Sequence, residues 1–374
     1  MKKQIAAILI GCTLTLTACG SADGEVSTET TASAGSADTI SDTSDVQSAK
    51  EQTIIETVGI SKPEPVQIAL VTSSGGLEDE SFNQSAWEGL QRAVGTYGCE
   101  PLYAETRSDT TFKDNLDNVI AQGGDLCWGI GYSCAEDMLK AAQEHPEISF
   151  AIIDNYFEDT PDNMTGVMFR AEESSFLVGY IAACVSETGK IGFVGGMKNE
   201  VIEQFRYGYM AGAYYADKEN GKTTEVLFEY SDTFSDSSKG KVLADTLYDN
   251  GCDVVFHAAG ETGLGVIESA KEHDLYVIGA DKDQSYLAPE NVIASAEKFV
   301  SVALYSLSGQ FISGENIGGQ TVSLGLAENA VGISSQHSLY SDEIYNKMLV
   351  LKDEIIAGTI VPPTDEESFT AFAK

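Results

Sequence analysis

Basic residues are scarce in this sequence of 374 residues, which has 22 lysines and arginines against 58 aspartates and glutamates. The formal net charge is −36 at pH 7. Nucleic acids and other phosphate-rich partners attract proteins through clustered positive charge. The sequence therefore argues against a nucleic-acid partner, and its excess of negative charge favours solubility.

Cysteine and histidine are also few. Of seven cysteines, Cys12 and Cys19 lie close to the N-terminus, and the other five form an odd set without a repeated spacing, which is a poor disulfide framework. We expect Cys127, Cys134 and Cys184, which have apolar neighbours, to be buried thiols. The four histidines have no ligand spacing to each other or to a cysteine, so we expect no metal site and no cofactor.

Apolar runs long enough to cross a membrane are missing as well. The stretch 5–16 follows Lys2 and Lys3 and has the length of a signal-peptide core, too short for a spanning helix. Leu16-Thr17-Ala18-Cys19 then matches a bacterial lipobox, although an ordinary secretory cleavage site is the alternative. The lipobox predicts a lipoprotein signal peptide over 1–18 and a lipid anchor on Cys19 at the outer face of the membrane.

Residues 19–64 contain no aromatic residue and are rich in Ser, Thr, Ala, Asp and Glu. Such a segment cannot bury enough apolar surface to offset its ordering entropy, so we interpret it as a disordered tether. The remaining chain, 65–374, exceeds the usual size of a single core, which predicts two domains.

Short apolar runs alternate with amphipathic stretches along this part of the chain, which predicts an α/β fold with two doubly wound lobes. The boundary falls near Thr188-Gly189: lobe one takes 65–188 plus about 295–315, and lobe two takes 189–294 plus about 316–374, the last a mixed segment that crosses between the lobes. Ligands of such sheets bind beyond the carboxyl ends of the strands, here in a cleft between the lobes. The expected strands are 66–72, 124–130, 148–153, 190–194, 224–230, 254–257, 275–278 and 292–294, and the expected helices are 82–97, 135–144, 172–186, 202–216, 239–249, 263–273 and 299–311.

The loop after the first expected strand runs from Ser73 to Gln84 and contains two glycines and three consecutive acids. Its spacing does not match a G-x-G-x-x-G phosphate cradle, and the acids would repel an anion. We interpret it as a tight turn, with Asp79 or Ser81 capping the next helix, that presents Phe82 and Asn83 to a neutral ligand.

Other strand ends carry polar or aromatic residues suited to a cleft. Asp154 follows one strand, where it is either a loop or capping acid or a ligand contact, and Phe234 lies in a polar loop after another. Gly260 lies in a glycine-rich turn that permits close backbone approach. Asp281 could accept two hydrogen bonds from a vicinal diol, and Lys298 could balance the acids.

Six motifs in this order resemble the basic membrane protein family, the PnrA-like nucleoside-binding lipoproteins. They are Glu80-Ser81-Phe82-Asn83-Gln84-Ser85-Ala86-Trp87-Glu88-Gly89-Leu90, Gly192-Phe193-Val194-Gly195-Gly196-Met197, Tyr207-Gly208-Tyr209-Met210-Ala211-Gly212, Phe256-His257-Ala258-Ala259-Gly260, Gly263-Leu264-Gly265-Val266-Ile267-Glu268 and Ile278-Gly279-Ala280-Asp281-Lys282-Asp283-Gln284.

The resemblance implies a type I periplasmic-binding-protein-like fold and a role as the nucleoside receptor of an ABC-type importer, with purine nucleosides as the usual ligands. By that resemblance Phe82 and Phe234 would sandwich the base, while Asn83 and Asp154 would bond polar atoms. Gly260, Asp281 and Lys298 would hold the ribose.

Two positions depart from the family pattern. Ser73 stands where an aspartate usually meets the base, and a hydroxyl cannot replace a carboxylate that accepts from two N–H groups. Ala280 and Lys282 flank Asp281, where a hydrophobic and a small polar residue are usual. The base that the site prefers therefore stays open.

A receptor for an importer is the function that the sequence favours, with a monomer as the working state. A ligand-sensing lipoprotein on the same fold is an alternative, since one fold hosts several functions. A nucleoside-processing enzyme is a further alternative, but the consecutive acids Glu78, Asp79 and Glu80 point apart in a helix or strand and would not hold a metal ion together.

Overall fold

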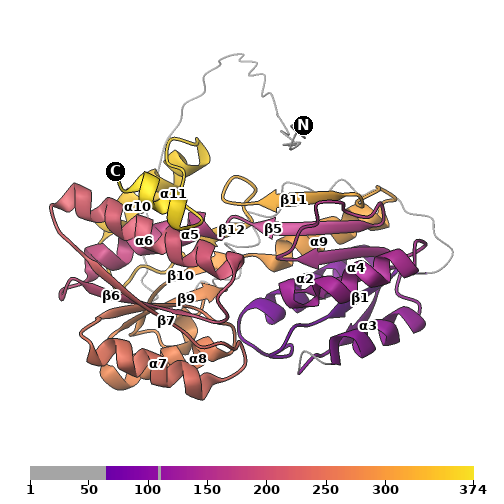
Figure 1. Cartoon of the computed structure of the whole chain (residues 1–374), viewed down its shortest axis with the longest axis horizontal. Helices are drawn as coiled ribbons and strands as arrows, with labels where there is room; N and C mark the ends of the chain where they lie inside the picture. Colours follow the sequence, from indigo (N-terminus) through magenta and orange to yellow (C-terminus); the bar gives the residue numbers. More distant parts are fainter. Residues whose placement is uncertain (1–64, 108–110) are drawn as a thin grey trace, which may run out of the picture. The chain divides into compact units, whose positions relative to one another are not determined.

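A computed structural model describes residues 65–107 and 111–374 of the chain. The predictions for the signal peptide, Cys19 and the tether lie outside these residues. Two six-stranded sheets organise the described part, and each is the centre of one lobe (Figure 1). The predicted fold class, two doubly wound α/β lobes, is confirmed.

The sheet of lobe 1 has the order β11-β5-β4-β3-β1-β2, and all its pairings are parallel. Its first four strands alternate with helices along the chain. Each helix therefore carries the chain back to the end of the sheet where the next parallel strand begins. The strands are β1 (Gln67–Val71), β2 (Glu100–Ala104), β3 (Leu126–Ile130), β4 (Ser149–Ile153), β5 (Met164–Phe169) and β11 (Gln320–Leu324).

The sheet of lobe 2 has the order β12-β10-β9-β8-β6-β7, in which only β12 runs antiparallel to its neighbour. Its central strands are buried along their whole length, as expected for a sheet covered on both faces. The strands are β6 (Lys190–Gly195), β7 (Glu225–Tyr230), β8 (Val254–Ala258), β9 (Tyr276–Asp281), β10 (Val292–Lys298) and β12 (Val331–Ile333).

Helices cover both faces of each sheet, and the alternation of side chains along the strands shows which helix lies where. Ala69 and Val71 of β1 pack with α3 and α4, whereas Ile68 and Leu70 face the side of α2 and α9. Helices α7 and α8 cover one face of the second sheet and α5 and α6 the other. The helices are α2 (Phe82–Tyr97), α3 (Phe112–Ala121), α4 (Ala135–Glu144), α5 (Ala171–Val185), α6 (Glu200–Asn220), α7 (Ser237–Asp249), α8 (Thr262–His273), α9 (Val300–Ile312), α10 (Asp342–Ile356) and α11 (Glu366–Phe372), with short 3-10 turns η2 (Tyr132–Cys134) and η3 (Ser285–Leu287).

Three segments lie elsewhere than the predicted lobe boundaries place them. Helix α5, predicted in the first lobe, packs against α6 of lobe 2 so closely that a Cβ on Gly212 would lie 1.9 Å from the carbonyl oxygen of Phe176. Strand β11, predicted in the second lobe, pairs with β5 of lobe 1, and β10 continues to Lys298 in lobe 2. These long-range pairings leave no local mark in the sequence.

Several elements were not predicted at all, namely the strands β2, β5, β11 and β12, the helices α3, α10 and α11, and the turns η2 and η3. Strand β2 is an edge strand with Pro101 in it and little buried surface, so its apolar signal is weak. Within the described residues five cysteines are unpaired. Cys127 and Cys134 are buried as predicted, whereas Cys184 is only partly buried at the end of α5.

Candidate functional site

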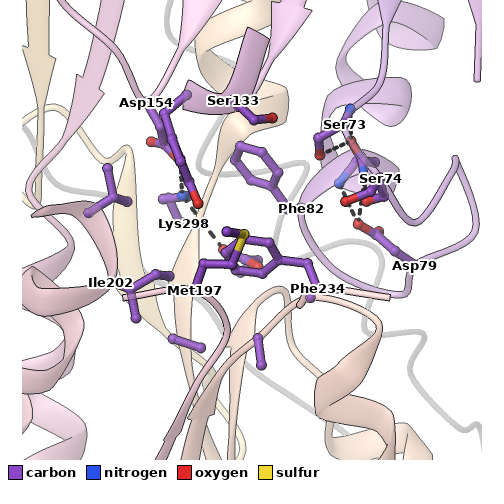
Figure 2. Close-up of a pocket in the computed structure, with 18 of the residues that line it drawn as sticks. Ser73, Ser74, Asp79, Phe82, Ser133, Asp154, Met197, Ile202, Phe234 and Lys298 are labelled. Atoms are coloured by element: carbon purple, nitrogen blue, oxygen red, sulfur yellow. Dashed lines mark hydrogen bonds and ion pairs between the residues drawn. The ribbon is translucent and has the colours of Figure 1, made fainter. Parts of the chain in front are cut away.

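A cavity between the two lobes is lined by residues from the carboxyl ends of strands in both sheets (Figure 2). The empty space between its walls is about 850 Å³, a volume that includes the part open to solvent. All eight residues predicted as ligand contacts line it, namely Ser73, Phe82, Asn83, Asp154, Phe234, Gly260, Asp281 and Lys298. The structure thus brings them together, and their contacts with a ligand stay a prediction.

The loop that precedes α2 is held by Asp79, whose buried carboxylate accepts from the backbone N–H groups of Ser81, Asn83 and Gln84 at 2.8–3.0 Å. The cap predicted for this helix is therefore supplied by Asp79, since the Ser81 side chain makes no capping bond. Burial raises the pKa of Asp79, while the hydrogen bonds from these N–H groups act in the opposite direction. Asp79 in this way fixes the start of α2, where Phe82 and Asn83 lie.

The amide of Asn83 is occupied by neighbouring protein groups. Its Oδ1 accepts from both the backbone N–H and the hydroxyl of Ser73, each at 3.1 Å. Its Nδ2 donates to Asp79 at 3.0 Å and to the carbonyl of Ser74 at 3.4 Å. These four bonds use the hydrogen-bonding capacity of the amide. Asn83 therefore holds Ser73 and the loop before α2 in place. The ligand bond that the resemblance implies for Asn83 stays a prediction.

One end of the cavity is charged. The Lys298 ammonium lies 2.7 Å from Asp154 Oδ2 and 3.9 Å from Asp281 Oδ1, and all three side chains are buried. Ser81, from lobe 1, donates its hydroxyl to the other oxygen of Asp281. Burial raises the pKa of Asp281, with the Lys298 charge and the Ser81 hydroxyl opposing it. This end offers carboxylate acceptors beside an ammonium donor, a set suited to hydroxyl groups.

Asp154 and Asp281 both have a left-handed backbone, with φ of 62° and 66°. Aspartate adopts this conformation more readily than most residues. Each lies at or directly after the carboxyl end of its strand, β4 or β9. The two strands belong to different lobes, so the sharp change of direction after each brings the carboxylates to the same ammonium.

Aromatic rings from both lobes border the rest of the cavity. Phe82 comes from the first turn of α2, and the Lys298 ammonium lies 4.3 Å from the centre of its ring. Phe234 follows β7 and meets Tyr132 edge to face, with ring centres 6.5 Å apart. A Cβ on Gly196 would lie 2.1 Å from the Phe234 ring, so only glycine leaves room for this ring. Figure 2 shows Phe82 and Phe234 facing the same space from opposite lobes.

Sequence reasoning missed part of the wall. Tyr132 and Ser133 directly follow β3, and Met197 comes soon after β6, so the strand-end rule could have found them. The apolar residues from α6 carry no such signal, because they resemble core residues in sequence. The missed lining residues are Ser74, Asp79, Gly131, Tyr132, Ser133, Met197, Val201, Ile202, Phe205, Ala258 and Ala259.

Within residues 65–107 and 111–374, no three histidine, cysteine or carboxylate side chains form a group that could hold a metal ion. The same part of the chain contains no helix that is both long and apolar enough to span a membrane.

Comparison with known proteins identifies the family to which this chain belongs. The sequence profile of the PnrA-like ABC transporter substrate-binding proteins matches residues 66–366, which include every residue of the cavity. The chain belongs to this family. The PnrA-like family consists of substrate-binding proteins of transporters, so a solute-binding role outside the cytoplasm follows from membership.

Relatives within the PnrA-like family include basic membrane protein B of Borreliella burgdorferi, 39% identical over 325 residues that cover 84% of this chain and 92% of that protein. Basic membrane protein A of the same organism is 38% identical over 305 residues, 80% of this chain and 88% of that protein. The sequence resemblance to the basic membrane proteins is thereby confirmed.

Among solved structures, a solute-binding protein of an ABC transporter system from Aeropyrum pernix K1 is similar to this chain, with a TM-score of 0.75 and 28% identity. The match covers 82% of this chain and 96% of the other. A solute-binding protein from Conexibacter woesei has the same fold, with a TM-score of 0.65 and 21% identity.

Proposed function

We propose that this protein captures a nucleoside in the cavity between its lobes and delivers it to an ABC-type importer. The observation that carries the proposal is the pairing of Phe82 and Phe234 across the cavity, beside a charged end built from Asp154, Asp281 and Lys298. A nucleoside has one flat aromatic part and one part rich in hydroxyl groups, which match these two regions.

The two rings would stack on the base, and each base–aromatic contact contributes ~1–3 kcal/mol. The hydroxyls of the ribose would bond Asp281 and Lys298, near the backbone of Gly260. Asp154 would hold the Lys298 ammonium in place, and Asn83 would keep Ser73 and α2 in position. The hydroxyl of Ser73 would then be the group of this wall that meets the base.

The charge of the cavity favours nucleosides over nucleotides. Three aspartates line it, Asp79, Asp154 and Asp281, against the single ammonium of Lys298. A phosphate would be repelled by these buried carboxylates, since the low dielectric of the site strengthens like-charge repulsion.

The location that fits this role is the extracellular face of the bacterial cell membrane, with the chain attached through lipid on Cys19. The lipobox pattern supports this anchor, and the family supports a transporter as partner. The permease would receive the ligand when the lobes open, with a single copy of the chain as the receptor.

Calorimetric titration of the purified full chain, freed of co-purified ligand, tests the proposal. The panel contains adenosine, guanosine, inosine, cytidine, uridine, ribose and adenosine monophosphate. We expect saturable binding of at least one nucleoside. Adenosine monophosphate should bind at least tenfold more weakly because the carboxylates repel its phosphate, and free ribose at least tenfold more weakly because it has no base to stack on the rings. A folded sample that binds no nucleoside would show that the proposed ligand class is wrong.

A further inference from the structure

We propose that a set of contacts outside the cavity determines how long the protein holds its ligand. This set, here called the latch, consists of Glu80 and Glu88 in lobe 1 and Lys282, Gln284 and Tyr286 in lobe 2. None of these five residues lines the cavity. Their role is to position the lobes, so they would affect affinity without touching the ligand.

Three bonds of the latch join the lobes. The Lys282 ammonium lies 2.6 Å from Glu88 Oε1 on α2. Gln284 Nε2 donates to the backbone carbonyl of Glu80 at 3.0 Å, and the Tyr286 hydroxyl donates to the Glu80 carboxylate. All three connect α2 or the residue before its N-cap with the segment after β9, near the Ser81–Asp281 bond at the cavity.

The latch is anchored on both sides, which lowers the entropy lost when the lobes meet. Gln284 is fully buried, its Oε1 accepts from the Ala280 N–H at 3.0 Å, and its own N–H donates to Ser295 at 3.1 Å. On the other lobe, Glu88 also accepts from Gln84 at 3.4 Å. Side chains that are already partly ordered lose less conformational entropy when they form a bond than freely rotating ones do.

The structure shows which acid pairs with Lys282. Its neighbours Asp281 and Asp283 could in principle have been its partners, but its ammonium reaches across to Glu88 in the other lobe.

Contacts made only when the lobes are together shift the balance between open and closed protein toward the closed form. A ligand enclosed between the lobes can leave only after they separate, so each such contact slows dissociation. In the free protein the latch keeps part of the population closed, so loss of a latch contact lowers that closed fraction and, with it, the apparent affinity.

The expected effects are moderate because the latch is partly exposed. The side chains of Lys282 and Glu88 are 18% and 45% exposed, and ion pairs of this kind are weak. We expect Lys282→Gln to raise the dissociation rate about two- to fivefold. Tyr286→Phe removes a hydrogen bond to a carboxylate and should raise it about three- to tenfold.

The test measures dissociation by stopped flow on the full chain, with the tightest-binding nucleoside of the calorimetric panel as the probe. The variants are Lys282→Gln, Tyr286→Phe, the combination of these two, Lys282→Glu alone, and the charge-reversed pair Lys282→Glu with Glu88→Lys. Lys113→Gln is the matched control, since Lys113 pairs with Asp117 inside one helix of lobe 1. We expect faster dissociation in the first three, partial recovery in the reversed pair relative to Lys282→Glu alone, and no change in the control.

A second measurement needs no ligand. It therefore tests the latch independently of the proposed nucleoside, whereas the stopped-flow test rests on the proposed function. Hydrogen exchange of the backbone segments 131–134 and 258–261, which lie at the cavity, should be faster in the latch variants than in wild type and control. Dissociation or exchange equal to wild type in variants that melt at the wild-type temperature would overturn the latch. A wild-type protein that binds no nucleoside would overturn only the proposed ligand, and exchange would then decide the latch.

Discussion

The ammonium of Lys298, at the end of β10 in lobe 2, lies 2.7 Å from the carboxylate of Asp154, which follows β4 in lobe 1. Both side chains are less than a tenth exposed, so each would be a costly buried charge without the other. The pair therefore crosses the cleft and balances charge inside it. A ligand hydroxyl can join this pair without displacing either partner, because carboxylates and ammonium groups each make several hydrogen bonds.

Removing the ring of Phe82 should weaken binding of a nucleoside. Phe82→Ala is expected to raise the dissociation constant about tenfold or more through lost stacking, which calorimetry would measure. Tyr103→Ala is the matched control, because Tyr103 is an exposed aromatic residue of the same lobe outside the cavity. Equal affinity of the Phe82 variant and the wild type would exclude Phe82 as a stacking residue.

Asp281 should matter for the sugar more than for the base. Asp281→Asn removes a charged acceptor, so we expect a loss of about 10- to 100-fold for nucleosides and a much smaller one for free bases. The matched control is Asp283→Asn, since Asp283 does not line the cavity and accepts from the Ser285 N–H. If nucleosides and bases weaken alike, Asp281 does not bind the ribose.

Gly196 determines where Phe234 lies. A methyl group at Gly196 would clash with the ring at 2.1 Å, so Gly196→Ala should displace the ring and lower nucleoside affinity about tenfold. Gly95→Ala in α2, where a Cβ meets no atom within 4 Å, is the control and should bind normally. Calorimetry gives the affinities and thermal melting shows whether the variants fold. Wild-type affinity in a folded Gly196 variant would show that the position of this ring does not govern binding.

The stability of the protein should depend on the ionisation of Glu172 in the first turn of α5. Burial raises the pKa of this carboxyl to about 7, and its Oε2 has no hydrogen-bond partner in the described part of the chain. With the folded pKa above the unfolded value, ionisation costs stability above pH 7, and the cost disappears as the pH falls from about 7 toward the ordinary value of 4.5.

Glu172→Gln removes this cost. The variant should be more stable than the wild type at pH 8 by about 2–3 kcal/mol, and this advantage should shrink toward pH 5. Denaturant unfolding of both proteins at the two pH values measures it. Glu173→Gln is a contrasting variant, since Glu173 pairs with Arg170 and its loss should destabilise the protein at pH 8. An advantage of Glu172→Gln that is the same at pH 5 and pH 8 would contradict the shift.

Local patterns in the sequence were sufficient to predict the fold class. The period of apolar residues marks Phe82–Tyr97 as a helix with the same bounds as α2, and alternation of such helices with buried strands permits few architectures. The rule that ligands bind beyond strand ends then led to Asp154, Asp281 and Lys298, which the structure brings into one cavity. Both inferences depend on residues close together in the chain.

Contacts between distant residues were decided by the tertiary structure alone. Nothing near β11 in the sequence indicates that it pairs with β5, and nothing near Asn83 shows that its amide is used by Ser73 and Asp79. The partner of Lys282 could equally have been an acid beside it, but packing of the two lobes gave it Glu88. Periodicity reports which face of an element is buried, whereas the choice of partner depends on how far-separated segments fit together in space.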